Sequence, residues 1–437
     1  MTVCIATDSY YPQPGGIATF YGHLSKLLIQ QGHQCIVLTI GSDINNVQKQ
    51  DEVLEENGLT KVVLHKTYYE QLAYYKKFFR PGGYEAYRWI SIGVAMRKWL
   101  EQNATVYNIE IVEASDYGGF GLFLVDRSLP PLVISGHGSL LQYSKINFSG
   151  NDEQVLLIKK MEQLSFNCAD GIIAHSYLNK EDLEKITSTP VAFATAPWIN
   201  NGVVESLPKK NFIAVIGGLQ VIKGGITMAK TVELLAKNDP HFKLYWVGPD
   251  FFVAPGSERM SLYLRNTFKH IWGKNFIWLD QLSRDEAKKM LLTAQLIVIP
   301  SDWETFNYVA LEAAWQGKPI IITKNTGAEY IFEHETEALV IPARDENALA
   351  SAIIHLLANP GFAQQLGRNA HEKIKRLFFP EKIVEERLGA YRLFIKHRKK
   401  HSNFQLRTSF LSRYISLHRK VYYRTRAILK RILLERK

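Results

Sequence analysis

The sequence has few cysteines and no long hydrophobic segment. Its three cysteines, Cys4, Cys35 and Cys168, are too few and too scattered for a disulfide framework or a zinc site. No run of about 18 uninterrupted apolar residues occurs, so no membrane-spanning helix is expected. Residues 1–10 lack the basic start and apolar stretch of a signal peptide. These absences argue against a disulfide-stabilised secreted protein and favour a reducing cytoplasm.

The excess positive charge is concentrated at the C-terminus. The chain has 53 Lys and Arg against 42 Asp and Glu, a formal net charge of +11. Residues 396–437 contain fourteen of these basic residues and a single acid, Glu435, which leaves the preceding residues almost neutral. Apolar residues recur in this region at roughly helical spacing, at Leu411, Tyr414, Ile415, Tyr422, Ile428, Leu429, Ile432 and Leu433.

We interpret residues 397–437 as a basic amphipathic helical tail that contacts an anionic membrane surface. A solvated extension is one alternative. Nucleic-acid binding is another, but it rests on the tail alone, because no recognition motif accompanies it.

Length and patterning predict two α/β domains. A chain of 437 residues exceeds the roughly 100–200 of one domain, and 46% hydrophobic residues exclude a mostly disordered chain. Short apolar runs alternate with helical stretches, as in parallel strands covered on both faces. In the first half the predicted strands are Val3–Thr7, Cys35–Ile40, Val62–Leu64, Ile109–Val112, Leu132–Ser135 and Gly171–Ala174. In the second half they are Phe212–Ile216, Lys243–Val247, Phe276–Leu279, Leu296–Pro300, Pro319–Thr323 and Ala338–Ile341.

Two successive series of strand–helix repeats predict two Rossmann-like, doubly wound sheets. The join is expected within Val203–Lys210, where the pattern breaks before a new strand begins. We therefore place an N-terminal domain at residues 1–202 and a C-terminal domain at 203–378. Because ligands collect at the carboxyl ends of parallel strands, a site is expected in the cleft between the two domains.

Two strand-to-helix loops contain candidate phosphate-binding groups. The first strand runs into a Pro/Gly loop with Gly15 and Gly16, and the amides at the following helix start suit an anion. In the second half Gly217 and Gly218 end a strand, and Lys223 follows at a helix start, well placed for a phosphate. Neither loop is a dinucleotide fingerprint, and the chain has no Gly-Lys-Ser/Thr of a P-loop. An ordinary strand–helix turn and a surface lysine are the alternatives.

The strongest signal follows the strand that ends at Pro300. Glu304 lies in the next loop, and Glu312 lies eight positions later inside a helix. The start of that helix offers backbone amides from about Phe306 to Val309. Such a layout can bind a phosphate by amides and two hydroxyl-bearing rings by carboxylates. The alternative is that Glu304 caps the helix and Glu312 is solvated, although the apolar neighbours of Glu312 disfavour a fully solvated position.

At these residues the sequence resembles glycosyltransferase family 4, the retaining nucleotide-sugar enzymes with the GT-B fold. Glu304 and Glu312 match that family's Glu–seven residues–Glu motif. The other matching segments are Gly15-Gly16, Asn201-Gly202-Val203, Gln316-Gly317-Lys318-Pro319, Thr326-Gly327-Ala328-Glu329 and Leu339-Val340-Ile341-Pro342. The resemblance covers most of residues 1–396, and the order and spacing of the segments make it specific. It implies that residues 1–202 are the acceptor-side domain and that residues 203–378 bind the nucleotide sugar. It also implies that residues 379–396 form a helix returning to the N-terminal domain.

The resemblance also implies a role for each matching position. It places Glu304 beside the donor sugar hydroxyls, Lys223 at the diphosphate leaving group, and His137 against the donor sugar from the N-terminal domain. The glycines at 136 and 138 favour an exposed loop around His137, whose alternative is a structural histidine. The implied donor-binding residues are Gly15, Gly16, Gly218, Phe306, Asn307, Tyr308, Val309 and Glu312. Among them, Glu312 accepts from the ribose hydroxyls.

Two positions depart from the family pattern. The family usually has Gly-Arg-Leu where this chain has Gly217-Gly218-Leu219, so Gly218 replaces the arginine that accompanies the lysine. Loss of one phosphate-binding cation can remove several kcal/mol of transition-state stabilisation, unless another base substitutes or the donor or mechanism differs. Asn307 stands in place of the usual glycine after the aromatic residue and is expected to constrain the donor sugar.

The predicted function is retaining transfer of a sugar from a UDP- or GDP-linked donor to a hydroxyl acceptor, in cell-surface polysaccharide or glycolipid synthesis. The nucleotide-diphosphate sugar is a co-substrate, and no cofactor is expected. Because no Asp-x-Asp pair occurs, no metal is expected either. In the implied front-face mechanism, the acceptor attacks the side from which the nucleotide diphosphate leaves, and a β-phosphate oxygen takes the proton. A weakened nucleotide-sugar-binding protein, an epimerase and a phosphorylase of the same fold are the alternatives.

A second basic segment lies in the first half of the chain. Residues 61–98 contain eight Lys and Arg against two acids, with nine aromatic residues among them. We interpret this segment as an acceptor-binding or membrane-contacting surface, although helix packing would bury some of the aromatics. Together with the tail at 397–437, it predicts a cytoplasmic protein that associates peripherally with the anionic inner face of the membrane.

Overall fold

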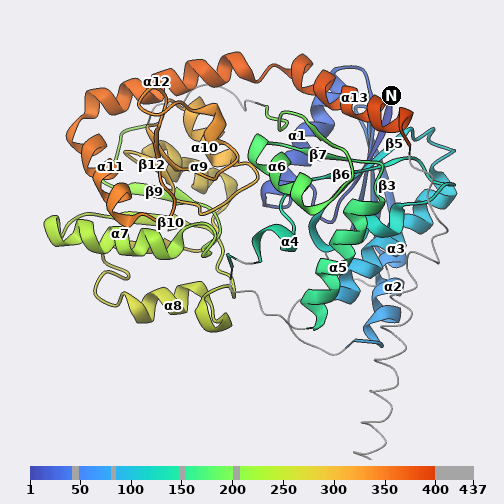
Figure 1. Cartoon of the computed structure of the whole chain (residues 1–437), viewed down its shortest axis with the longest axis horizontal. Helices are drawn as coiled ribbons and strands as arrows, with labels where there is room; N and C mark the ends of the chain where they lie inside the picture. Colours follow the sequence, from blue (N-terminus) through green and yellow to red (C-terminus); the bar gives the residue numbers. More distant parts are fainter. Residues whose placement is uncertain (42–48, 80–84, 145, 148–152, 200–206, 399–437) are drawn as a thin grey trace, which may run out of the picture.

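The computed structural model describes residues 1–41, 49–79, 85–144, 146–147, 153–199 and 207–398. These residues form two lobes that lie side by side, each built around one sheet (Figure 1). Three features predicted from the sequence lie outside the described residues: the tail from residue 399 onward, the Asn201-Gly202-Val203 segment, and residues 203–206 of the expected join.

The N-terminal domain contains an eight-stranded sheet in the order β3-β4-β2-β1-β5-β6-β7-β8. All neighbouring strands are parallel except β3 and β4, which form an antiparallel hairpin at one edge. The strands are β1 (Thr2–Ala6), β2 (Gln34–Ile40), β3 (Glu52–Glu56), β4 (Leu59–Leu64), β5 (Ile111–Ser115), β6 (Leu132–Ser135), β7 (Gly171–Ala174) and β8 (Val191–Phe193). The sheet confirms the predicted Rossmann-like fold and adds an antiparallel edge to it.

The C-terminal domain contains a six-stranded, fully parallel sheet in the order β11-β10-β9-β12-β13-β14. Its strands are β9 (Ile213–Ile216), β10 (Leu244–Val247), β11 (Phe276–Leu279), β12 (Ile297–Ile299), β13 (Ile320–Thr323) and β14 (Leu339–Ile341). Each matches one of the six apolar runs predicted for this half. The continuous apolar runs occur because helices cover both faces of the sheet.

Two strands of the structure, β3 and β8, are not predicted by the apolar runs in the sequence. The edge strand β3 has the sequence Glu-Val-Leu-Glu-Glu and is mostly exposed, so it has no buried run to detect. Strand β8 has only three residues, all half-buried, at the opposite edge of the sheet. Edge strands need less apolar surface than central ones and often carry charge, which protects them from unwanted pairing.

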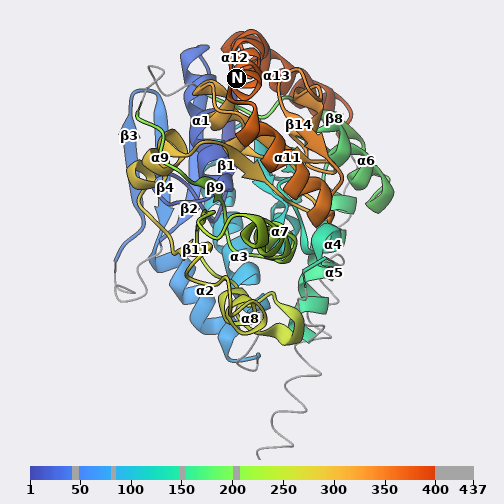
Figure 2. The same cartoon turned by 90° about the vertical axis from the view of Figure 1, so that its left-hand side faces the viewer.

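Helices connect the strands in both domains. In the N-terminal domain they are α1 (Gly16–Gln30), α2 (Lys66–Lys76), α3 (Ala86–Asn103), α4 (Leu140–Tyr143), α5 (Glu153–Cys168) and α6 (Tyr177–Ile186), with a 3-10 segment η1 (Tyr117–Leu124). In the C-terminal half they are α7 (Gly225–Asn238), α8 (Met260–Thr267), α9 (Arg284–Thr293), α10 (Tyr308–Trp315), α11 (Glu346–Ala358), α12 (Pro360–Leu377) and α13 (Pro380–Lys396), with 3-10 turns η2 (Pro255–Ser257) and η3 (Glu329–Ile331). Both views place α12 and α13 along the same end of the molecule (Figure 2).

The last described helix, α13, returns to the N-terminal domain and packs against α1 and β8. Its Arg387 is fully buried, with one guanidinium nitrogen 3.1 Å from the carboxylate of Glu113 on β5. The hydroxyl of Tyr391 donates to the same carboxylate, and the guanidinium lies 5.3 Å from the ring centre of Phe20. A buried ion pair therefore joins the C-terminal end of the described chain to the centre of the first sheet.

Two buried carboxylates hold the loops that follow β5 and β6. Asp116 accepts hydrogen bonds from the backbone N–H groups of His137 and Gly138, both at 3.0 Å. Glu162 accepts from the backbone N–H groups of Gly118, Leu140 and Leu141. Burial raises the pKa of Asp116 to about 7, and burial together with repulsion from Asp116 raises the pKa of Glu162 to about 8. The N–H donors oppose both shifts.

We expect Arg387→Met to lower the free energy of unfolding by about 3–5 kcal/mol, because it leaves the Glu113 carboxylate buried without its cation. The double variant Glu113→Gln/Arg387→Met removes both charges and should be less destabilised than Arg387→Met alone. Urea denaturation of the wild type, of the single variants Arg387→Met and Glu113→Gln and of the double variant measures the difference. A double variant as unstable as the sum of the two single variants would show that the pair contributes no coupling energy.

The raised pKa values of Asp116 and Glu162 predict that stability falls as the pH rises. Unfolded carboxyl groups ionise near about pH 4, whereas these two hold their protons to about pH 7 and 8 in the folded state. The folded state therefore binds more protons in this interval, and each group contributes a slope of at most about 1.4 kcal/mol per pH unit. Urea denaturation from about pH 5 to about pH 8 measures the slope, and Glu162→Gln is expected to flatten it. An unchanged slope in Glu162→Gln would contradict the assignment.

Candidate functional site

A cavity of about 300 Å³ lies between the two domains, where loops from the carboxyl ends of both sheets meet. The N-terminal domain contributes α1 and the loop after β6, and the C-terminal domain contributes the loops after β9 and β12. Of the residues predicted from the sequence, the cavity brings together Gly16, His137, Lys223, Glu304, Phe306 and Tyr308. The other predicted residues, Gly15, Gly218, Asn307, Val309 and Glu312, are not among those that line it.

Glu304 is the centre of the polar contacts in this cavity. Its side chain is 4% exposed, and Oε1 lies 2.6 Å from the Lys223 ammonium. The hydroxyl of Ser301 donates to Oε1 at 2.6 Å, and the side-chain amide of Asn307 donates to Oε2 at 2.7 Å. A carboxylate this deeply buried needs such partners, and the three contacts hold it in one orientation.

A turn packed against Glu304 holds its backbone as well. The backbone N–H of Gly327 donates to Glu304 O at 2.8 Å, and Glu304 N–H donates to Asn325 O at 3.3 Å. A Cβ atom at position 327 would lie 1.7 Å from Thr305 O, so only glycine fits this close approach. This turn is the Thr326–Glu329 segment on which part of the resemblance rests.

Asn307 caps the N-terminus of helix α10 and links the helix to Glu304. Its Oδ1 accepts from the backbone N–H of Ala310 at 2.9 Å, which is an N-cap, while its amide nitrogen donates to Glu304. The helix therefore starts two positions after Phe306, the first of the amides predicted to bind phosphate, with Tyr308 as its first residue. N–H groups in the first turn of a helix have no intrahelical acceptor, so those of Tyr308 and Val309 remain available to a ligand.

His137 lies at the end of β6 in a packed environment. Its ring centre is 4.5 Å from Phe20 and 5.2 Å from His175, and its Nε2 is buried without a hydrogen-bond partner in the described part of the chain. Burial, with a smaller contribution from Arg387, lowers the pKa of His137 to about 3, so the imidazole is neutral at physiological pH. The expectation of an exposed loop is wrong, because the flanking glycines are buried.

The glycine at 136 is needed for packing against α6. A Cβ atom there would lie 2.8 Å from Leu183 and 2.9 Å from the side chain of Asn179. Gly138 has a φ of 114°, a backbone conformation that side-chain-bearing residues rarely adopt. The Gly-His-Gly pattern therefore reflects close packing and backbone geometry, and His137 is among the residues that line the cavity.

The space beside Gly218 is occupied by an aromatic ring. A Cβ atom at 218 would lie 2.6 Å from Cε2 of Phe251, so the phenyl ring stands where a longer side chain would begin. Within the described residues, Lys223 is the one lysine or arginine that lines the cavity. The substitution of arginine by Gly218 is thus accompanied by an aromatic neighbour and not by a second cation in the cavity wall.

Glu312 lies on α10 and is half-buried, as its apolar neighbours suggested. Burial raises its pKa, and the nearby Arg284 partly opposes the shift. At the opposite wall, Gly15 precedes α1 with a φ of 127° and has open space beside it. Both residues flank the cavity and do not line it.

Sequence patterns did not identify the residues whose hydrogen bonds connect the two domains. Trp303 donates its ring N–H to Asp182 on α6 at 2.8 Å, and Thr305 donates its hydroxyl to His137 O at 3.1 Å. Asn147 reaches from the N-terminal domain to the loop that carries Lys223. These partners are more than 70 positions apart in the chain, so no local spacing could have revealed them.

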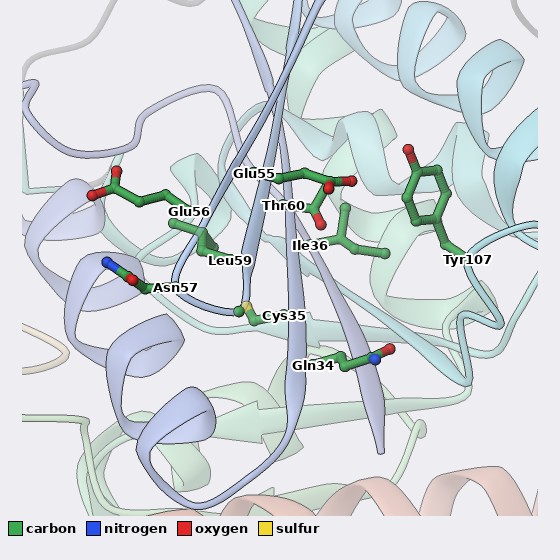
Figure 3. Close-up of a pocket in the computed structure, with 10 residues that line it drawn as sticks. Gln34, Cys35, Ile36, Glu55, Glu56, Asn57, Leu59, Thr60 and Tyr107 are labelled. Atoms are coloured by element: carbon green, nitrogen blue, oxygen red, sulfur yellow. The ribbon is translucent and has the colours of Figure 1, made fainter.

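A larger cavity of about 400 Å³ lies away from this site, at the β2–β3–β4 edge of the first sheet (Figure 3). Figure 3 shows that the carboxylates of Glu55 and Glu56 point to opposite sides of the strands. Its remaining polar groups include Gln34 and Tyr107. Size alone therefore does not identify the site, and the interdomain cavity is the candidate because its charged groups converge.

The basic segment at 61–98 is partly a structural element of the N-terminal domain. Tyr68, Tyr69, Tyr87 and Trp89 are buried in its core, as the packing alternative predicted, while Tyr74 is 53% exposed. No helix within the described residues has the length and apolar character needed to cross a membrane. The same residues include no group of three or more His, Cys, Asp or Glu side chains able to hold a metal ion.

Comparison with known sequences identifies the family. Residues 14–203 match the family described as Glycosyltransferase Family 4, and residues 200–373 match Glycosyl transferases group 1. An uncharacterized glycosyltransferase of Methanocaldococcus jannaschii is 22% identical over 408 residues, which cover 90% of this chain and 98% of that protein.

Solved structures show the same fold. Sucrose-phosphate synthase from Thermosynechococcus elongatus superposes with a TM-score of 0.67 at 19% identity, covering 90% of this chain and 99% of that one. The crystal structure of TarM gives a TM-score of 0.65 at 12% identity, covering 89% of this chain and 98% of that one. The protein belongs to glycosyltransferase family 4 and has the GT-B fold, with two Rossmann-like domains facing each other across a cleft.

Proposed function

We propose that the protein transfers a sugar, with retention of anomeric configuration, from a nucleotide-diphosphate sugar to a hydroxyl acceptor. The observation that carries this proposal is the Lys223–Glu304 pair at 2.6 Å in the interdomain cavity, beside the start of α10. A cation, a carboxylate and free helix N–H groups at one place suit a diphosphate joined to a hydroxyl-bearing ring. No metal or further cofactor enters the proposed reaction.

Donor binding is expected to separate Lys223 from Glu304. A diphosphate presents more negative charge than one carboxylate, so we assign the Lys223 ammonium and the N–H groups of Tyr308 and Val309 to the phosphates. The Glu304 carboxylate, still held by Ser301 and Asn307, then accepts from hydroxyl groups of the sugar. The two residues that pair with each other in the free protein thus contact the two ends of the donor, Lys223 at the diphosphate and Glu304 at the sugar.

The transfer step requires no nucleophile from the protein. The acceptor oxygen bonds to the anomeric carbon as the bond to the β-phosphate oxygen breaks, and that phosphate oxygen takes the acceptor's proton. Lys223 and the helix N–H groups stabilise the negative charge that develops on the leaving diphosphate. His137, with its neutral ring and unpartnered Nε2, is assigned a hydrogen bond to the donor sugar from the opposite wall.

We propose that the donor nucleotide is UDP or GDP. Glu312, the second acid of the Glu–seven residues–Glu motif, is assigned to the ribose hydroxyls of that nucleotide. A structure of S. aureus TarM contains UDP, which makes UDP the first nucleotide to test. The acceptor is proposed to be a saccharide or glycolipid of cell-surface polysaccharide or glycolipid synthesis. This assignment is supported by the basic segment at 61–98 and the basic tail at 397–437, both suited to an anionic membrane surface.

Three alternatives are separated by product analysis. A binding protein with weakened catalysis, suggested by Gly218, would bind a nucleotide sugar without releasing the nucleotide. An epimerase would convert the sugar without an acceptor, and a phosphorylase would require inorganic phosphate. Incubation of the purified protein with a panel of UDP- and GDP-sugars, followed by chromatography of the products, distinguishes these outcomes from transfer.

We expect Lys223→Ala and Glu304→Ala each to lower nucleoside-diphosphate release by about 100-fold or more, because each removes a group that acts on the reacting donor. Lys230→Ala is a matched control, since Lys230 forms a surface ion pair with Glu346 on the same domain at 3.4 Å. Its turnover should equal that of the wild type. Undiminished turnover in Lys223→Ala and Glu304→Ala would contradict the proposal.

We also propose that the protein works in the cytoplasm, bound peripherally to the inner face of the membrane. Deletion of residues 401–437 is expected to abolish co-sedimentation with vesicles containing anionic phospholipid, because the deletion removes most of the excess positive charge. High salt should have the same effect, and vesicles of neutral phosphatidylcholine serve as the control. Binding that survives both the deletion and high salt would rule out this role for the tail.

A further inference from the structure

Asn147 of the N-terminal domain forms a buried contact with the loop that carries Lys223. The residue lies just after α4, where its backbone N–H donates to Tyr143 O at 3.2 Å, and it is 3% exposed. Its Oδ1 accepts from the backbone N–H of Ile222 at 2.9 Å, and its Nδ2 donates to Gln220 Oε1 at 3.3 Å. Because a backbone N–H can only donate, the contact to Ile222 also determines which way the amide of Asn147 faces.

The loop that Asn147 touches is held on its other side by the strand β12 region. Ile222 O accepts from the backbone N–H of Asp302 at 2.8 Å. Gly224 has a φ of 81°, and a Cβ atom there would lie 2.0 Å from Pro300 O, so the loop sits directly against the end of β12. Lys223 lies between these two anchored residues. The backbone around the lysine is therefore held by several contacts within its own domain and by the hydrogen bond from Asn147 of the opposite domain.

Two further hydrogen bonds between the domains also involve residues next to a charged residue of the cavity. Thr305 donates to His137 O at 3.1 Å, and Trp303 donates to Asp182 at 2.8 Å. Both donors are immediate chain neighbours of Glu304, as Ile222 is the neighbour of Lys223. These three hydrogen bonds between the domains thus end next to the two charged residues that the cavity brings together.

We propose that Asn147 is a positioning residue for the transfer reaction, and that it orders the 220–223 loop and the Lys223 ammonium when the two domains are closed. This inference rests on the proposed function, in which Lys223 neutralises the leaving diphosphate. Separation of the domains breaks the hydrogen bond to Ile222 N–H and releases that side of the loop. The lysine therefore reaches its working position only when the acceptor-side domain is in place.

The variant Asn147→Ala tests this role in the full-length protein. We expect kcat for nucleoside-diphosphate release to fall by about 10- to 100-fold, because small displacements of a catalytic group cost this much. The KM for the nucleotide sugar and the Kd for UDP or GDP should change by less than about threefold, since the C-terminal domain keeps its own contacts. Asn147→Ser, whose side chain is too short to reach Ile222, should behave in the same way.

A matched control separates positioning from stability. Asn275 is also 3% exposed, and its side-chain nitrogen donates to Pro240 O and Phe242 O within the C-terminal domain. Asn275→Ala is expected to lower the melting temperature as Asn147→Ala does, while its folded fraction retains the wild-type kcat. Wild-type kcat in Asn147→Ala and Asn147→Ser, or an equal loss in Asn275→Ala, would overturn the inference.

The outcome for the wild-type protein separates this inference from the proposed function. If the wild type neither binds UDP or GDP nor releases them from any sugar in the panel, the proposed function fails and the inference falls with it. If the wild type is active and Asn147→Ala is equally active, the proposed function stands and the positioning role of Asn147 is wrong.

Discussion

The buried ion pair between Arg387 and Glu113 joins the C-terminal end of the described chain to the N-terminal domain. It anchors α13, the last described helix, to the central part of the first sheet, although the preceding helices cover the second sheet. Two fully desolvated charges are costly unless each has its partner, so the helix has a strong preference for this position. With α13 held there, the carboxyl ends of both sheets face the same cavity, where Lys223 and Glu304 meet.

The free-energy cost of burying a charge is met differently at different residues in and behind the cavity. Glu304 remains next to a cation and two hydrogen-bond donors, whereas burial favours the protonated forms of Asp116 and Glu162 and the neutral form of His137. Among the residues that line the cavity, the ion pair is formed by Lys223 and Glu304, which would meet a diphosphate and a sugar. The carboxyl groups behind the cavity instead organise backbone loops, among them the one that presents His137.

Much of the fold could be predicted because its signals are local. The twelve strands inferred from apolar runs all occur, and the strand-end loops with Gly16, Lys223 and Glu304 do line one cavity. The failures have equally specific causes. Strand β3 is a charged edge and lacks an apolar run. Helix α6 packs against Gly136, and Trp303 of the other domain packs against Gly138, so the glycines that suggested exposure are buried. Aromatic residues such as Trp89 and Tyr87 serve the core and not a surface.

By itself, the sequence determined the alternation of strands and helices, the two Rossmann-like domains and the presence of a Glu–seven residues–Glu motif, because periodicity and short spacing are properties of neighbouring residues. Only the tertiary structure decided that Glu304 is paired with Lys223, that Phe251 fills the space beside Gly218, and that Asn147 bonds to the opposite domain. These contacts join residues that are distant in the chain. Their partners are selected by packing and by the need to satisfy buried polar groups, which no local pattern encodes.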